Sequence, residues 1–272
     1  MFSKSKQPSH GTSDSTEDFP WWLLFVLGIG GYLAYRIVAD ELYASIFSII
    51  AKGAWITAFV TIVAFLIASC IGLLLAMASL SGSVVMRQSA RFYIEVIRGI
   101  PILVMLFYIA FVGAPLFVAF WNSVLTPLGL EPVRTRDISL LWRAIIALTI
   151  GYSAFIAEVF RAGILAVDQG QKESAMALGL SRWHRFRFVI FPQALRTILP
   201  PLGNDFIALI KDSSLVSVLG VADITQLGKV YAAGSFRFFE TYNIVAYVYL
   251  LMTILLSLLL RKLERSLSNK TN

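Results

Sequence analysis

The chain has 272 residues, of which 58% are hydrophobic and 14% charged, and its formal net charge is +7. Soluble domains average about 45–50% apolar and about 25% charged residues, so this composition excludes an ordinary soluble protein and indicates a membrane protein. The excess of cations fits the positive-inside rule and gives no reason to expect nucleic-acid binding. The single cysteine, Cys70, lies in an apolar run, which excludes an intrachain disulfide and a cysteine-based metal site.

The N-terminal part of the chain divides into three stretches. Residues 1–20 are polar and rich in serine, and we expect a disordered cytoplasmic tail that lacks the pattern of a secretory signal. Residues 21–39 form an apolar stretch just long enough to cross a bilayer as an extra transmembrane helix; a re-entrant or surface helix is the alternative. Residues 40–52 are mixed in character, and we predict that they lie along the outer surface.

Five further apolar stretches are long enough to cross a membrane, and the chain is therefore predicted to be an all-α membrane protein, a polytopic bundle of about six transmembrane helices. These stretches cover residues 53–80, 92–118, 142–166, 200–221 and 241–260. The connecting segment 122–141 is predicted to be an aqueous loop, and the segment 222–240 is again polar.

Small residues and prolines predict local features of these spans. Within 53–80 a small residue recurs every fourth position and predicts a smooth face for close helix packing inside the chain; the residues are Ala64, Ala68, Gly72 and Ala76. Gly99 and Pro101 predict a kink or a restart in the 92–118 span. The double proline at 200 and 201 is predicted to begin the fifth span.

The distribution of Lys and Arg predicts the orientation. With the N-terminus inside, fifteen of the 23 cations fall in inner segments and seven in outer ones, and Lys211 lies within a span. The positive-inside rule therefore favours six spans with both termini cytoplasmic. This orientation places the polar segment 168–192 inside the cell.

Residues 168–201 are the longest polar, basic run between apolar flanks, and they predict two short helices. Asp168 is expected to cap the first helix and Gly179 to end it. Ser181 is expected to cap the second, which runs to Pro192.

Glu173, Ser174 and Ala175 are followed four residues later by Gly179, and then by the sequence V-I-F-P at 189–192. This spacing resembles the EAA loop of ABC-importer permeases, whose consensus is E-A-A, three residues, glycine, nine residues and I-x-L-P. The spacing agrees at every position, although Ser, Val and Phe replace Ala, Ile and Leu. Together with the R-G-I-P sequence at 98–101, the resemblance extends over 53–265 and points to the polar amino acid permease subfamily (histidine, glutamine and arginine type), with a type I ABC importer architecture.

The resemblance implies that the first short helix couples the chain to a separate ATPase. Glu173, Ser174, Ala175 and Gly179 would form the docking site, and the substrate would be a polar or charged amino acid. The implied partners are two ABC ATPase subunits, a second permease subunit (the same chain or a paralogue), a periplasmic solute-binding protein and the lipid bilayer of the bacterial cytoplasmic membrane. The alternative is that Glu173 and Gly179 merely cap and end a solvated helix.

The fifth span contains a run of polar residues, namely Asn204, Asp205, Lys211, Asp212, Ser213 and Ser214. An ionisable group inside a membrane costs at least ~2.5 kcal/mol on insertion scales, so these residues are candidates for the substrate path. Lys211 could pair with the carboxylate of an amino acid, and Asp212 or Asp205 with its ammonium group. A structural ion pair with another helix is the alternative. Glu158 and Arg161, three residues apart, are predicted to form a local pair.

The sequence has no phosphate-binding G-x-x-x-x-G-K-[ST] loop, no H-E-x-x-H motif and no recognisable catalytic triad. We therefore expect neither enzyme activity nor a cofactor or metal in this chain, and ATP hydrolysis would take place in a partner subunit. The main rival interpretation is an ion-coupled secondary transporter or channel that uses Lys211 and Asp212. A membrane enzyme is disfavoured by the absent catalytic groups.

Overall fold

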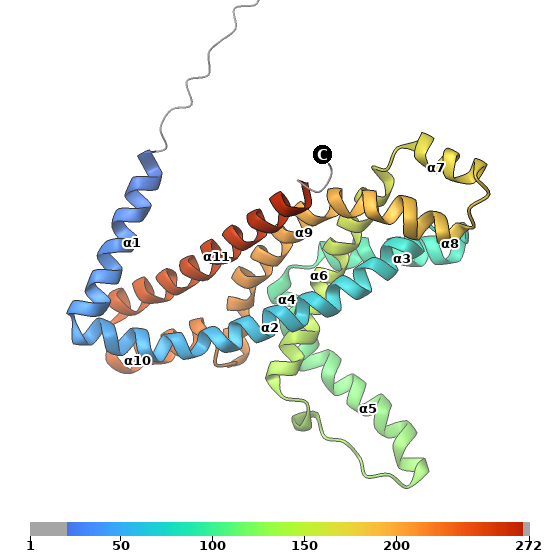
Figure 1. The fold of residues 1–272 in the computed structure, drawn as a ribbon. Coiled ribbons are helices and arrows are strands. Elements are labelled where there is room, and N and C mark those ends of the chain that lie inside the picture. The colour runs from blue at the N-terminus through green and yellow to red at the C-terminus, as the bar shows by residue number, and fades with distance from the viewer. Residues whose placement is uncertain (1–20, 269–272) are drawn as a thin grey trace, which may run out of the picture.

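The computed structural model describes residues 21–268, and every regular element among them is a helix (Figure 1). The predicted tail at 1–20 lies outside the described residues. The elements in chain order are α1 (Trp21–Ala39), α2 (Glu41–Ser79), α3 (Val84–Gly99), α4 (Ile102–Tyr108), the π-helix η1 (Ile109–Gly113), α5 (Ala114–Leu125), the 3-10 turns η2 (Thr126–Leu128) and η3 (Thr135–Asp137), α6 (Leu140–Leu165), α7 (Gln169–Ala177), α8 (Arg182–Arg185), the π-helix η4 (Phe186–Ile190), α9 (Phe191–Asp212), the 3-10 helix η5 (Ser213–Leu219), α10 (Ile224–Ser235) and α11 (Phe238–Ser268).

The centre of the fold is the contact between α2 and α6. The small residues that recur every fourth position in α2 are all buried, which confirms the predicted packing face. A Cβ atom at Gly72 would lie 2.9 Å from Cγ2 of Ile156 and 3.1 Å from the backbone nitrogen of Ala157 on α6. The two backbones therefore approach so closely that only small side chains fit between them.

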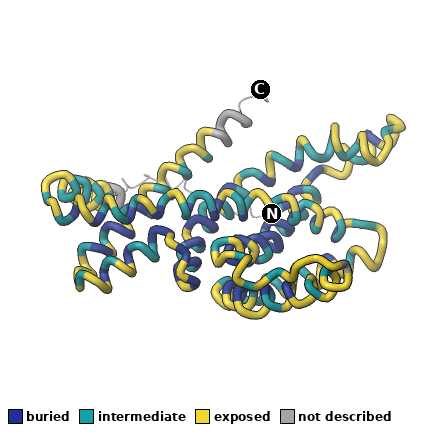
Figure 2. Tube along the Cα trace, turned by 90° about the horizontal axis from the view of Figure 1, so that it is seen from below, coloured by how far each residue is buried: buried dark blue, intermediate teal, exposed yellow. Residues whose placement is uncertain are grey.

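A large hydrophobic core surrounds this contact and draws on α2, α4, α6, α9 and η5. Its fully buried members include Val60, Leu106, Leu148, Ile198 and Leu209. Figure 2 shows the buried residues along the inner sides of these helices, whereas the outward sides are exposed. This core therefore holds α6 and α9, the two helices that the segment 166–190 connects.

A second hydrophobic cluster corrects the prediction for residues 40–52. The sequence predicts a surface segment there, but these residues form the first turns of α2, capped by Asp40, whose Oδ1 accepts the Leu42 N–H at 2.9 Å. Tyr43, Ile46 and Ile50 are buried there against residues of α10 and α11. The polar stretch 222–240 contains α10. The prediction for 40–52 was wrong because the apolar partners of this segment lie far away in the sequence.

The prolines have different effects in the two predicted places. The break between α3 and α4 at Gly99–Pro101 is confirmed. In contrast, Pro200 and Pro201 do not begin a helix, because α9 already starts at Phe191 and passes through both. Both prolines are on the exposed side of α9, where their rings need no space in the core. The predicted fifth span also ends earlier than expected, since η5 follows Asp212.

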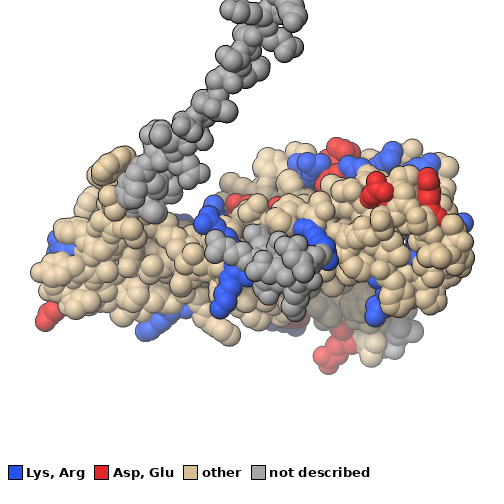
Figure 3. Space-filling model, turned by 45° about the horizontal axis from the view of Figure 1, so that its top comes forward, with Lys and Arg blue, Asp and Glu red and all other residues tan. Residues whose placement is uncertain are grey.

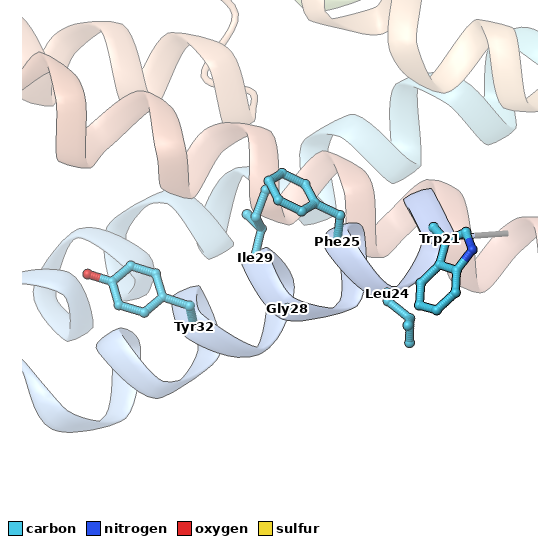
Figure 4. A pocket seen from close by; sticks show the side chains of 6 residues that line it. All are labelled: Trp21, Leu24, Phe25, Gly28, Ile29 and Tyr32. Carbon is cyan, nitrogen blue, oxygen red and sulfur yellow. The ribbon is translucent and has the colours of Figure 1, made fainter.

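Within the part of the chain that the structure describes, four helices are long and apolar enough to cross a membrane by length and composition: Glu41–Ser79, Ile102–Leu125, Leu140–Leu165 and Phe238–Lys262. Of the other two predicted spans, α9 has 22 residues, about 33 Å at 1.5 Å per residue, and carries the charges noted above. The last is α1, a helix of 19 residues. One face of α1 is open and forms a shallow apolar groove (Figure 4), which suits contact with lipid; it is lined by Trp21, Leu24, Phe25, Gly28, Ile29 and Tyr32.

Candidate functional site: the loop between α6 and α9

The loop between α6 and α9 carries α7, a nine-residue helix capped at both ends. Asp168 caps the N-terminus, where its Oδ1 accepts the Gln171 N–H at 3.2 Å. At the other end the Leu180 N–H donates to the Ala175 carbonyl at 3.2 Å, and the Gly179 N–H to that of Met176 at 2.9 Å. These two bonds with Gly179 at φ +73° form a Schellman motif, so both predicted caps are confirmed.

A second helix follows directly, and the prediction of its end was wrong. Ser181 caps it as expected, with Oγ accepting the His184 N–H at 3.4 Å. The helix then continues through the π-helix η4 into α9 instead of ending at Pro192. In η4 the Phe191 N–H bonds to the carbonyl five residues earlier, and this wider turn carries the helix past the proline. The loop is thereby joined rigidly to a core helix.

The four residues predicted to contact an ATPase do not share one environment. Glu173, Ser174 and Gly179 are exposed, and the Glu173 carboxylate accepts a hydrogen bond from Gln169 at 3.1 Å. Ala175 is only 2% exposed and packs within its own chain. Its small side chain therefore lets α7 lie close to the rest of the loop rather than to a partner.

Two apolar side chains on the outer surface of α7 were missed by the sequence analysis. Leu178 is 79% exposed and Met176 50% exposed, next to the exposed Glu173. Leu178 is three residues from Ala175, so helical spacing alone would place both on one face. Leu178 points outward because it is the C-cap residue, where the chain leaves the helical path. The sequence carries no signal for this exposure.

Charged residues gather at the end of the molecule that carries this loop. Figure 3 shows blue and red atoms grouped at the right, where α7 and α8 lie, while much of the left half is uncharged. Arg182, Arg185 and Arg187 follow the first helix directly. Cations next to α7 agree with the positive-inside rule that predicts a cytoplasmic location for this loop.

The polar residues of α9 and η5 divide into two groups. Asn204 and Lys211 are exposed on the open side of α9. Asp205 is half-buried, and its Oδ2 has no hydrogen-bond partner among the described residues. Asp212, in contrast, accepts a hydrogen bond from the Tyr152 hydroxyl at 2.8 Å.

The two serines of this run have structural hydrogen bonds. Ser213 is fully buried, and its Oγ donates to the Ile210 carbonyl at 2.6 Å. The Ser214 carbonyl accepts the Ser217 hydroxyl at 2.7 Å. Among the side chains that the structure describes, Lys211 and Asp212 have no ion-pair partner. The adjacent side chains thus point in different directions, as helical geometry requires.

The local ion pair on α6 is confirmed, with Arg161 Nη2 2.6 Å from Glu158 Oε2. Arg98 lies over the ring of Phe155, its Cζ 5.6 Å from the centroid. No group of three or more His, Cys, Asp or Glu side chains in the described ranges could hold a metal ion.

Known proteins resemble this chain in both sequence and fold. It is 38% identical over 214 residues to the glutamine transport system permease protein GlnP of Escherichia coli (strain K12), which covers 79% of this chain and 90% of that protein. It is 37% identical over 228 residues to the probable amino-acid permease protein YxeN of Bacillus subtilis (strain 168), covering 84% and 95% of the two chains.

Two solved structures share the architecture. An amino acid ABC transporter crystallised with histidines has a TM-score of 0.69 at 37% identity, covering 85% of this chain and 98% of that one. The inward-facing methionine transporter MetNI has a TM-score of 0.63 at 21% identity, covering 80% and 96%, and supports the fold alone. A family model described as "Binding-protein-dependent transport system inner membrane component" matches residues 68–271. The chain therefore belongs to this family, the multi-pass membrane permeases of ABC importers.

Proposed function

We propose that this chain is the permease subunit of an ATP-driven importer for polar or charged amino acids. The family assignment supports an importer, and the relatives at 37–38% identity are named as glutamine and amino-acid permeases. The observation that carries the proposal is α7, a short helix capped at both ends and fused through α8 and η4 to the core helix α9. Such a helix can transmit a displacement from a partner into the membrane bundle.

In this proposal α7 docks on an ATPase subunit through its exposed surface. Glu173 and Ser174 offer polar contacts, and Leu178 and Met176 offer apolar area that a partner can bury. Ala175 holds α7 against its own chain, and Gly179 provides the turn that directs the chain back to α9. One helix of nine residues buries too little area for a stable interface, so two permease subunits engage two ATPases.

The substrate path runs along the open side of α9. Lys211 supplies a cation for the carboxylate of an amino acid, and Asp205 an acceptor for its ammonium group. Asn204 lies seven residues before Lys211, on the same helix face. Asp212 and Ser213 hold the bundle through the bonds described above, and Ser214 marks the turn into η5.

The proposed location is the bacterial inner membrane, with both termini and α7 in the cytoplasm and a solute-binding protein docking on the outer side. The distribution of Lys and Arg supports this orientation. Fifteen of the 23 cations lie in the segments assigned to the cytoplasm.

Reconstituted transport tests the proposal. The chain with its ATPase and binding protein in proteoliposomes is expected to take up a radiolabelled polar amino acid when ATP is present, and vanadate should stop the uptake. An ion-coupled transporter, the rival interpretation, would lose uptake when ionophores collapse the gradient and would not respond to ATP. Uptake by the purified chain alone, without nucleotide, would contradict the proposal.

A further inference from the structure

Arg143, in the first turn of α6, is a buried arginine held by backbone carbonyls. Its residue is only 8% exposed. Nε donates to the Ile138 carbonyl at 2.9 Å, Nη1 to that of Ala110 at 2.9 Å, and Nη2 to that of Thr135. No carboxylate among the side chains that the structure describes lies within ion-pair distance of it. The position of the guanidinium is therefore fixed, but its charge is not balanced by an anion.

The Ala110 carbonyl is available to Arg143 because of the local backbone. In η1 the Ala114 N–H bonds to the Ile109 carbonyl, five residues earlier, instead of to Ala110. The next residue, Pro115, has no N–H to offer. A backbone oxygen left without a donor inside a membrane is costly, and Arg143 supplies the missing donor. Three of the five N–H groups of its guanidinium are used in this way, and two remain.

A cavity of about 290 Å³ lies beside this guanidinium. Its walls are otherwise apolar and include Ile109, Phe117, Ile138 and Ile146. Phe117 is 55% exposed and Ile146 44% exposed, so the cavity opens at the surface of the chain. Its position at the start of α6 adds the positive end of a helix dipole to the charge of Arg143.

We propose that this cavity binds an anionic phospholipid of the outer leaflet. The phosphate accepts hydrogen bonds from the remaining N–H groups of Arg143, and part of one acyl chain lies between Phe117 and Ile146. The volume is at the lower limit of ligand pockets, about 300 Å³, which suits a segment of a chain rather than a whole lipid. The unbalanced charge favours a lipid with net negative charge over a zwitterionic one.

The test compares two lipids on the full-length chain purified with its ATPase partner. Phosphatidylglycerol and phosphatidylethanolamine with matched acyl chains are titrated separately, and the lipids retained are counted by native mass spectrometry. We expect wild type to bind phosphatidylglycerol about tenfold more tightly, because both lipids offer a phosphate but the ammonium group of phosphatidylethanolamine is repelled by the unpaired charge of Arg143. Equal affinity for the two lipids would overturn the proposal.

Three variants locate the lipid. Ile146→Trp fills the cavity and leaves the hydrogen bonds of Arg143 in place, and it should abolish the preference for phosphatidylglycerol. Arg143→Gln should also abolish this preference, but it can disturb folding as well. The Ile146→Trp variant therefore determines whether the cavity binds the lipid. Leu255→Trp, at a 61% exposed position on α11, is the matched control and should bind like wild type. Retention of the full preference by Ile146→Trp would place the lipid elsewhere and refute the assignment.

Discussion

Gly179 offers a test that separates the effect of backbone conformation from that of steric clash in the loop between α6 and α9. Its φ of +73° is left-handed, and no atom outside its immediate neighbours lies within 4 Å of the point that a Cβ would occupy. A side chain therefore meets no obstacle within this chain, and the penalty is conformational. For an ordinary L-residue this penalty is about 1–2 kcal/mol, whereas asparagine tolerates the left-handed region. A change of 1–2 kcal/mol corresponds to a factor of about 5–30 in population.

Gly179→Asn and Gly179→Val form a matched pair, because the side chains are similar in size but differ in this tolerance. Both variants should insert into the membrane like wild type. ATP-driven uptake in proteoliposomes should be close to wild type for asparagine and lower for valine by up to about 5–30-fold, the factor by which the equilibrium constant of the Schellman turn falls. Wild-type uptake by the valine variant would refute the role of the turn. Equal impairment of both variants would refute the conformational reasoning and indicate steric exclusion by the partner.

Three further substitutions test the substrate path, the ATPase-docking surface and the packing of α2. Lys211→Ala should reduce uptake while the ATPase still co-purifies, and unchanged uptake kinetics would make Lys211 structural or idle. Leu178→Ser should leave thermal stability within about 0.5 kcal/mol but weaken ATPase binding roughly tenfold or more, because an interface that buries a leucine gains about 1.5–3 kcal/mol; equal ATPase retention in a titrated pull-down would contradict this. Gly53→Ala places a Cβ 2.5 Å from the Ile224 nitrogen and should destabilise the fold by about 1–3 kcal/mol, seen as a lower melting temperature in detergent. Gly82→Ala, which meets nothing within 4 Å, is its control and should melt like wild type.

The features that the sequence predicted well depend on residues close together in the chain. The caps at Asp168, Gly179 and Ser181 each involve a side chain or a turn spanning a few residues, so local chemistry is sufficient. The same holds for the break at Gly99–Pro101 and for the Glu158–Arg161 pair. The packing face of α2 could also be predicted, because small residues at helical spacing in a membrane span indicate close helix packing.

The features that the sequence missed depend on contacts between distant segments. The first turns of α2 are helical because Tyr43 and Ile46 pack on α10 and α11. The burial of Ala175 depends on how α7 packs against η4 and α9. Gln193 of α9 donates a hydrogen bond to the Gln171 side chain of α7 at 3.4 Å. Arg143 donates to the Ala110 carbonyl, 33 residues away, and this carbonyl lies in a π-helix that the hydrophobic periodicity of the sequence does not predict. Pattern reasoning cannot supply such partners, because they exist only once the bundle has assembled.

In the proposed mechanism α7 lies in the cytoplasm and receives the force of ATP hydrolysis, and accessibility labelling shows which side of the membrane it faces. Ser174→Cys is made in a Cys70→Ser background, so that the new thiol is the only one in the chain. A membrane-impermeant thiol reagent should label this residue in inverted vesicles but not in right-side-out cells, and addition of the ATPase subunit should protect it. Labelling from the outside, or labelling in inverted vesicles that the ATPase does not reduce, would contradict the account.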